Sequence, residues 1–302
     1  MIFLLPCLLL IAHVEAIVRQ YYIAAEEVDW EYYTDRTFTN AIPHDPYLGL
    51  LGPIIRAEVG DRIKVDFMNR ATKPYSLHPH THLDKQPLLP GQKVAPGHGY
   101  HFVWDIPTTT KFPANQSSLL WVYLSKANAV ADLHAGLIGP IVIYQQGYLT
   151  KTSPNSMFPS LAGGQVQEIF ALMMTTDENL LNEDEHFLES NRMYHINGFL
   201  YNNNPDLRMY YGKPTRWYVV SFGADEEDVH TAHWHGSTLL HHGHRVDVID
   251  LTPTSFEVLD MMPDNEGQWL FHCHVVLHFD AGMTAFYQVE KLEYTGEEGW
   301  DK

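Results

Sequence analysis

The chain has little cysteine. Only two cysteines, Cys7 and Cys273, occur among its 302 residues. Cys7 lies in an apolar N-terminal run, so a chain that loses this run keeps only Cys273. Such a chain is unable to form an internal disulfide. A leftover thiol in a secreted domain indicates a reactive group or intermolecular pairing, and we interpret this one as a metal ligand instead.

Long hydrophobic runs are also scarce. The one at residues 1–16 (MIFLLPCLLLIAHVEA) is typical of a secretory signal peptide cleaved after Ala16. No later run is long enough to cross a bilayer. We therefore expect a secreted, extracellular protein without a membrane span. Asn115-Gln116-Ser117 is an acceptor sequence for N-glycosylation.

Positive charge is the third scarcity. Lysine and arginine total 19 against 37 acidic residues, which gives a formal net charge of −18. This balance disfavours nucleic acid and anionic membranes as partners and favours cationic substrates or metal ions. Histidine, in contrast, is abundant, with 19 in the chain.

Short β-rich runs broken by glycine and proline predict β-sandwiches on each side of a Ser/Pro/Gly-rich linker. After the signal peptide we expect a first domain at residues 17–146, a linker at residues 147–165 and a second domain at residues 166–293. An acidic tail follows at residues 294–302. The two halves repeat each other. In particular, Trp121–Lys126 overlays Trp269–His274, and His134–Leu137 overlays Asp280–Met283.

The strongest motif begins at Cys273, which is followed by His278 at +5 and Met283 at +10. A blue, type 1 copper site uses one thiolate, two imidazoles and a weak axial thioether. The second imidazole is expected from His230. It lies three residues before His233, so strand alternation places it on the opposite face from His233 and on the face of Cys273.

Three His-x-His pairs form a second pattern. Residues two apart on a strand share a face, so each pair would grip a metal together. Six imidazoles of this kind suit a copper cluster. The pairs are His78 with His80, His233 with His235, and His272 with His274.

The internal repeat also shows what the first half lacks. The positions of His230, Cys273, His278 and Met283 are occupied there by Tyr75, Ser125, Asp132 and Leu137. The first half therefore keeps one His-x-His pair and has no type 1 ligand set.

Several segments together resemble the multicopper oxidases of the ceruloplasmin and hephaestin group. They are Tyr22–Glu27, Gly49–Pro53, Ala135–Pro140 and the His-Cys-His stretch. The resemblance implies an all-β chain of two cupredoxin-like Greek-key β-sandwich domains, similar to the last two of six. It implies a ferroxidase that takes electrons from Fe(II) and reduces dioxygen, with a role in iron transport.

The resemblance also implies the roles of the histidines. His78 and His233 would hold a type 2 copper, and His80, His235, His272 and His274 a type 3 pair. Cys273, bonded to His272 and His274, would link the type 1 copper to that cluster, so these three residues are the expected catalytic set.

Three departures from the family pattern keep alternatives open. Leu124 and Lys126 stand where the family has two further cluster histidines, and Leu277 stands where its iron site has a carboxylate. The partner histidines would come from another chain, in a ring of three chains or in a longer six-domain protein. Besides the oxidase, a non-catalytic blue-copper protein for electron transfer or copper binding, and a copper-stabilised interaction module, remain as hypotheses.

Overall fold

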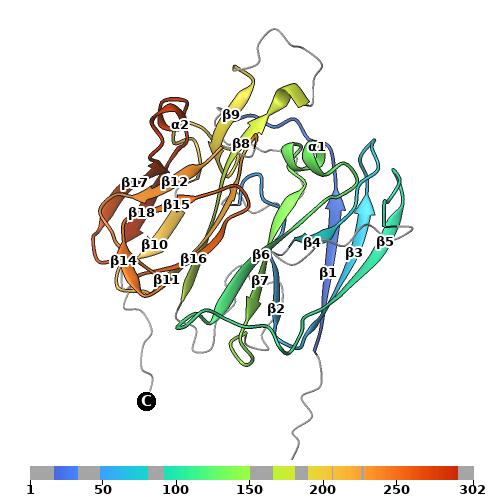
Figure 1. Ribbon diagram of the computed structural model, residues 1–302, viewed down its shortest axis with the longest axis horizontal. Helices are drawn as coiled ribbons and strands as arrows, with labels where there is room; N and C mark the ends of the chain where they lie inside the picture. Colours follow the sequence, from blue (N-terminus) through green and yellow to red (C-terminus); the bar gives the residue numbers. More distant parts are fainter. Residues whose placement is uncertain are drawn as a thin grey trace, which may run out of the picture.

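The computed structural model describes residues 17–32, 48–80, 92–149, 166–180, 190–205, 207–225 and 228–291. The expected signal peptide, the acidic tail and residues 150–165 of the expected linker lie outside this part of the chain. No helix among the described residues is long and apolar enough to cross a membrane. The described chain is almost entirely β-structure, which confirms the predicted fold class (Figure 1).

The first half folds into two sheets packed face to face. The three-stranded sheet contains β1 (Val18–Ala25), β3 (Arg62–Asn69) and β5 (Gly99–Asp105), in that order. The four-stranded sheet has the order β2 (Ile55–Glu58), β7 (Ile138–Tyr144), β6 (Ser118–Leu124) and β4 (His78–His80). Alternate residues of β3, among them Ile63, Val65 and Phe67, are buried between the two sheets.

The second half repeats this plan with larger sheets. Its six-stranded sheet has the order β14 (His244–Val246), β13 (Leu239–His241), β16 (Phe256–Met261), β11 (Thr215–Phe222), β8 (Gln167–Asp177) and β9 (Arg192–Ile196). Its five-stranded sheet has the order β10 (Leu207–Tyr210), β18 (Thr284–Glu290), β17 (Gly267–Cys273), β12 (His230–Trp234) and β15 (Val248–Leu251). The described helices are short: α1 (Ala129–His134), α2 (Val276–Asp280) and the 3₁₀ turn Glu178–Leu180.

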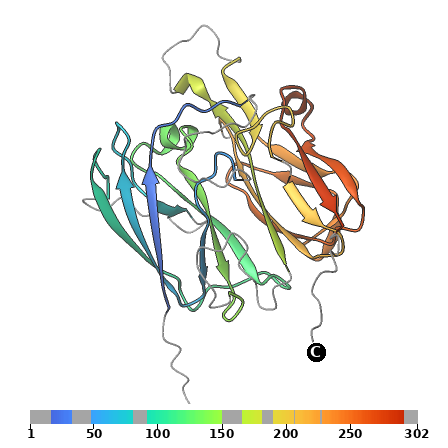
Figure 2. The same cartoon turned by 180° about the vertical axis from the view of Figure 1, so that it is seen from behind.

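Besides the core of each sandwich, a separate hydrophobic cluster joins the two sandwiches, which lie side by side in both views (Figures 1 and 2). Strand β11 is buried along its whole length because it faces two cores. Trp217 and Val219 point into the second sandwich, whereas Tyr218 and Val220 point toward the first. A buried ion pair between Arg56 and Glu168, at 3.0 Å, crosses the same interface.

His195 is a buried histidine of β9 whose hydrogen bonds fix one neutral tautomer. Its Nδ1 accepts from the Gly198 backbone N–H (2.9 Å), so the proton lies on Nε2, 2.9 Å from the Thr176 hydroxyl. Burial, with smaller contributions from His230 and His134, lowers its pKa to about 3. His195 therefore stays neutral in the folded protein at pH values where an unfolded chain would bind a proton.

This difference predicts a loss of stability in mild acid. In the unfolded chain the pKa of His195 is about 6.5, so below this pH the unfolded chain binds a proton that the folded protein does not bind. Unfolding therefore becomes easier as the pH falls. Between pH 6.5 and 5 His195 contributes about 2 kcal/mol of this loss. Denaturant titrations of His195→Gln should show a smaller decrease than the wild type. The exposed His98 serves as the control, because His98→Gln should leave the decrease unchanged.

Candidate metal centres

The pairing register of strands β12 and β17 determines which of their side chains lie together on each face of the sheet. Ala232 lies opposite Cys273, and His233 lies opposite His272. Directly opposite residues share a face of the sheet, whereas successive residues alternate. Consequently the thiol of Cys273 faces the core with Ala232 and His230, and the ring of His272 lies on the other face with His233.

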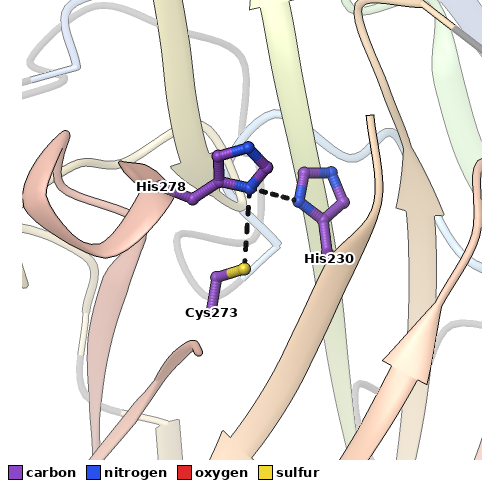
Figure 3. Close-up of side chains that lie close together, drawn as sticks. All are labelled: His230, Cys273 and His278. Carbon is purple, nitrogen blue, oxygen red and sulfur yellow. Dashed lines mark hydrogen bonds between the residues drawn. The ribbon is translucent and has the colours of Figure 1, made fainter. Parts of the chain in front are cut away.

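The core face of these strands brings together His230, Cys273 and His278 (Figure 3). The Nδ1 atoms of the two histidines are 3.1 Å apart, and the Cys273 sulfur lies 3.6 Å from Nδ1 of His278. All three residues are buried, and so is Met283. The Cys273 N–H donates to the Met283 carbonyl (3.0 Å), which holds Met283 beside the group.

Acceptor oxygens on the far side of both rings favour tautomers whose Nδ1 atoms carry lone pairs. His230 Nε2 lies 2.9 Å from the Phe222 carbonyl, and His278 Nε2 lies 3.4 Å from Oδ1 of Asp228. The Phe222 carbonyl places the ring proton of His230 on Nε2, so its Nδ1 carries a lone pair, and the nearby Asp228 carboxylate favours the same tautomer of His278. Burial lowers the pKa of His230, which keeps this lone pair available. Two lone pairs and a sulfur therefore converge on one point, an arrangement that a cation would stabilise.

The spacing of the three atoms fits a metal ion. Metal–nitrogen and metal–sulfur bonds of about 2.0 and 2.3 Å place neighbouring ligands of a trigonal plane roughly 3.5–3.7 Å apart. The observed separations of 3.1 and 3.6 Å are close to this range. Burial raises the pKa of the Cys273 thiol, so metal binding would have to displace its proton.

A helical turn brings His278 back to Cys273. Strand β17 ends at Cys273, and α2 folds the next residues over the strand end. The Met283 N–H then donates to the His278 carbonyl (2.9 Å). Gly282 between them has a φ of 105°, and a side chain there would meet the Tyr201 ring at 2.8 Å. The +5 and +10 spacings thus reflect one compact turn.

Asp228 is a positioning residue for His278 that the sequence motif did not reveal. Its Oδ2 accepts from the Ala224 N–H (2.9 Å), which leaves Oδ1 facing the imidazole. We expect Asp228→Asn to lower metal affinity at the Cys273 site about 10–100-fold, because the amide no longer fixes the ring proton. Titration of the metal-free variant with copper measures this effect. Asp250→Asn, at an exposed position on β15, should leave the affinity unchanged.

The opposite face of the same strands carries a second group, His233, His235 and His272. His272 Nε2 lies 3.1 Å from Nδ1 of His233 and 3.0 Å from Nε2 of His235. Its own Nδ1 donates to the Cys273 carbonyl (2.8 Å), so Nε2 presents a lone pair. The ring of the exposed His274 is 5.1 Å from that of His233.

Two of these imidazoles, His272 and His233, have lowered pKa values that favour the neutral ring. Burial, together with smaller contributions from neighbouring histidines, lowers the pKa of His272 to about 4, although the hydrogen bond to the Cys273 carbonyl acts in the opposite direction. The pKa of His233 is lowered by burial and by His235. A hollow of about 460 Å³, lined in part by His233, His235 and Asp247, opens beside the group. Neutral rings around an open hollow are suited to binding further metal ions.

The remaining predicted ligands, His78 and His80, lie in the first sandwich. Strand β4 pairs with β6, which places His78 opposite Leu124 and His80 opposite Val122. The His80 ring lies against Phe256 (6.0 Å) and Phe222 (6.5 Å). Among the described residues neither histidine joins the two groups around β17. Leu124 is buried in the cluster between the sandwiches, and Lys126 is partly buried.

In the first half, a hydrogen-bonded group occupies the place of the candidate ligands around Cys273. Ser125 donates to Asp132 (2.5 Å) and accepts from the Ser76 N–H (3.0 Å), just as the Thr231 N–H approaches the Cys273 sulfur (3.4 Å). The Ser125 N–H contacts the Leu137 carbonyl, matching the Cys273–Met283 contact. The backbone of the site therefore recurs with a hydroxyl and a carboxylate in place of thiol and imidazole.

Comparisons with known proteins agree with this geometry. Residues 49–147 and residues 174–293 each match a sequence family described as multicopper oxidase. The chain therefore belongs to the multicopper oxidase family. Within it, the sequence falls in the group of ceruloplasmin and hephaestin.

Human hephaestin is 34% identical over 90% of this chain, and human ceruloplasmin is 34% identical over 91%. Human ferroxidase HEPHL1 is 35% identical over 86%. The chain spans 28%, 27% and 25% of the lengths of these three relatives.

Solved structures share the fold at low identity. A multicopper oxidase has a TM-score of 0.64 and 19% identity, covering 90% of this chain and 89% of its own. A copper nitrite reductase from Nitrosomonas europaea has a TM-score of 0.63 and 16% identity, covering 90% and 94%. These likenesses support the two-sandwich architecture.

Proposed function

We propose that the protein is a secreted copper oxidase of the ferroxidase type, which oxidises Fe(II) and reduces dioxygen. The observation that carries this proposal is that adjacent residues of β17 belong to different groups of candidate ligands, Cys273 to one and His272 to the other. A relative named as a ferroxidase is 35% identical to the chain, which supports the choice of reaction.

In this proposal His230, Cys273 and His278 hold a type 1 copper, with Met283 as the weak axial ligand. Bound copper would supply one-electron oxidation and reduction. The chain's own contribution is to keep His230 neutral by burial, to orient the two imidazoles through Phe222 and Asp228, and to exclude water. The peptide bond between Cys273 and His272 is the shortest covalent route from this group to the next.

His233, His235, His272 and His274 would form one half of a trinuclear centre, with His233 on the type 2 copper and the others on the type 3 pair. The other half would be His78 and His80 of a neighbouring chain, in a homotrimer or in a longer assembly. This assignment is supported by the sheets to which the pairs belong: β4 lies in the four-stranded sheet of the first sandwich, whereas β12 and β17 lie in the five-stranded sheet of the second.

The acidic balance supports a cationic reductant. A net charge of −18 attracts Fe(II) at long range. Leu277, next to His278, is 61% exposed and offers no ligand atom, so iron binding would rely on other carboxylates. Asp177 and Glu178 are described candidates, while Glu183, Asp184 and Glu185 lie outside the described residues.

A second candidate function is a non-catalytic blue-copper protein for electron transfer or copper binding. The residues at Leu124 and Lys126 favour it. A hydrophobic side chain and an ammonium occupy positions where the proposed cluster needs imidazoles, and an ammonium repels copper ions at low dielectric.

Two measurements on one preparation separate the candidates. The copper content per chain is determined first, and oxygen uptake is then followed on adding Fe(II). Three or four copper ions per chain with steady uptake support the oxidase. One copper ion, a blue colour and no uptake would contradict the oxidase and support the second candidate.

A further inference from the structure

A third group of ligand atoms lies away from both centres, on the hairpin formed by β13 and β14. His241, His242 and Glu257 present two ring nitrogens and a carboxylate oxygen within 4.8 Å of one another. None of the three lines the hollow beside His233. The hairpin forms the edge of the six-stranded sheet (Figure 1).

The two histidines converge on one oxygen. Oε2 of Glu257 lies 2.8 Å from Nε2 of His241 and 3.5 Å from Nε2 of His242. The two rings are 4.0 Å apart between centroids. The His241 and Glu257 side chains are 17% and 26% exposed, and that of His242 is 53% exposed. The group is thus partly sheltered and still open to solvent on one side.

The backbone explains how adjacent histidines reach the same point. His241 and His244 pair across the hairpin, so His242 and Gly243 form a two-residue turn. Both turn residues have positive φ, 48° and 84°, as a type I′ turn requires. Asparagine is favoured at the first of these positions. Histidine occupies it here, and the left-handed backbone turns its ring toward His241 instead of onto the opposite face.

Glu257 reaches the hairpin from the neighbouring strand. β13 pairs with β16 through Leu239–Met261 and Leu240–Asp260, so Glu257 lies further along β16 on the face of Leu239 and His241. Strand β16 is also anchored to β11, where Glu257 pairs with Val219. Two candidate ligands from the hairpin at the sheet edge and one from an inner strand therefore lie close together.

We propose that His241, His242 and Glu257 form a surface site for a divalent first-row transition metal ion of the zinc class. Two imidazoles and one carboxylate are a common ligand set for Zn²⁺, and the open side leaves room for water as a fourth ligand. The bound ion ties the β13–β14 hairpin to β16. The site is independent of the proposed oxidase activity.

The test uses the full-length protein without an affinity tag and with its copper sites filled. Copper bound at the exposed surface is removed with a chelator before the titration, which leaves the surface site empty; because copper(II) exceeds zinc in the usual order of affinity, zinc should then leave the buried copper sites loaded. Isothermal titration calorimetry with Zn²⁺ is expected to show that one zinc ion binds per chain in addition to the copper already bound. The melting temperature should rise by at least about 3 °C at saturating zinc.

Three variants locate the site. Glu257→Gln keeps the side-chain size, and His242→Asn suits the type I′ turn, so both should fold. Each is expected to weaken zinc binding at least tenfold and to remove the rise in melting temperature. His244→Asn, in the same hairpin, is the matched control and should bind zinc as the wild type does.

Two outcomes would overturn the proposal. One is the absence of zinc binding by the wild type, which would leave the group as a hydrogen-bonded contact between histidine and glutamate. The other is zinc binding that survives in Glu257→Gln and His242→Asn or is lost in His244→Asn. Either outcome leaves the copper content and oxygen uptake of the protein as a separate question.

Discussion

Replacing Cys273 with serine is expected to remove the blue colour of the copper-loaded protein and to abolish Fe(II)-dependent oxygen uptake. A serine hydroxyl lacks the soft thiolate that a type 1 copper requires. Loss of outer-shell partners alone weakens metal binding about 10–100-fold, so loss of a ligand should cost at least about 100-fold. Copper analysis and the visible spectrum measure the effect.

The internal repeat supplies a matched control at Ser125. This residue occupies the place of Cys273 in the first half, with a hydroxyl bonded to Asp132 and to the Ser76 N–H. Ser125→Ala should cost about 1 kcal/mol of folding stability and leave the copper content unchanged. An intact blue colour in Cys273→Ser would show that copper lies elsewhere.

The double substitution Leu124→His and Lys126→His has the second large expected effect. If the proposed trinuclear centre forms between chains, the substitution would supply the two imidazoles that it lacks and remove an ammonium from its neighbourhood. Two unit charges about 4 Å apart repel by about 4 kcal/mol at an effective dielectric of 20. Copper affinity at the trinuclear centre should therefore rise at least about tenfold, with a corresponding gain in oxygen uptake.

The control for this variant separates ligation from loss of charge. Leu124→Asn with Lys126→Gln also removes the ammonium and also places a polar group at the buried position of Leu124. Both double variants should lose stability to a similar extent, because each buries a polar side chain. Only the histidine variant should gain copper. Equal copper content in the two would place this strand away from the cluster.

Strand alternation made much of the candidate site predictable from the sequence. It separated His230 from His233 and Cys273 from His272, because successive side chains of a strand point to opposite faces. The internal repeat likewise predicted which first-half residues replace the ligands. Ser125 and Asp132 form a direct hydrogen bond in the structure, and Cys273 and His278 converge at the corresponding place.

Contacts that depend on the order of strands in a sheet could not be predicted from the sequence. Asp228 and the Phe222 carbonyl orient the two imidazoles, yet neither belongs to the His-Cys-His motif. The group at His241 needs Glu257 from β16, and only strand pairing brings them together. Strand β11 is buried on one face by the core of the second sandwich and on the other by the cluster between the sandwiches. A continuous run of apolar residues indicates a strand covered on both faces, but it does not reveal which element covers the second face.

The central claim is that one strand, β17, serves two metal centres through opposite faces. Anomalous diffraction at the copper absorption edge, from crystals of the copper-loaded protein, tests it most directly. We predict a copper peak between the Cys273 sulfur and the Nδ1 atoms of His230 and His278, and further copper density beside His233, His235 and His272. The absence of copper between the Cys273 sulfur and the two imidazoles would contradict the account.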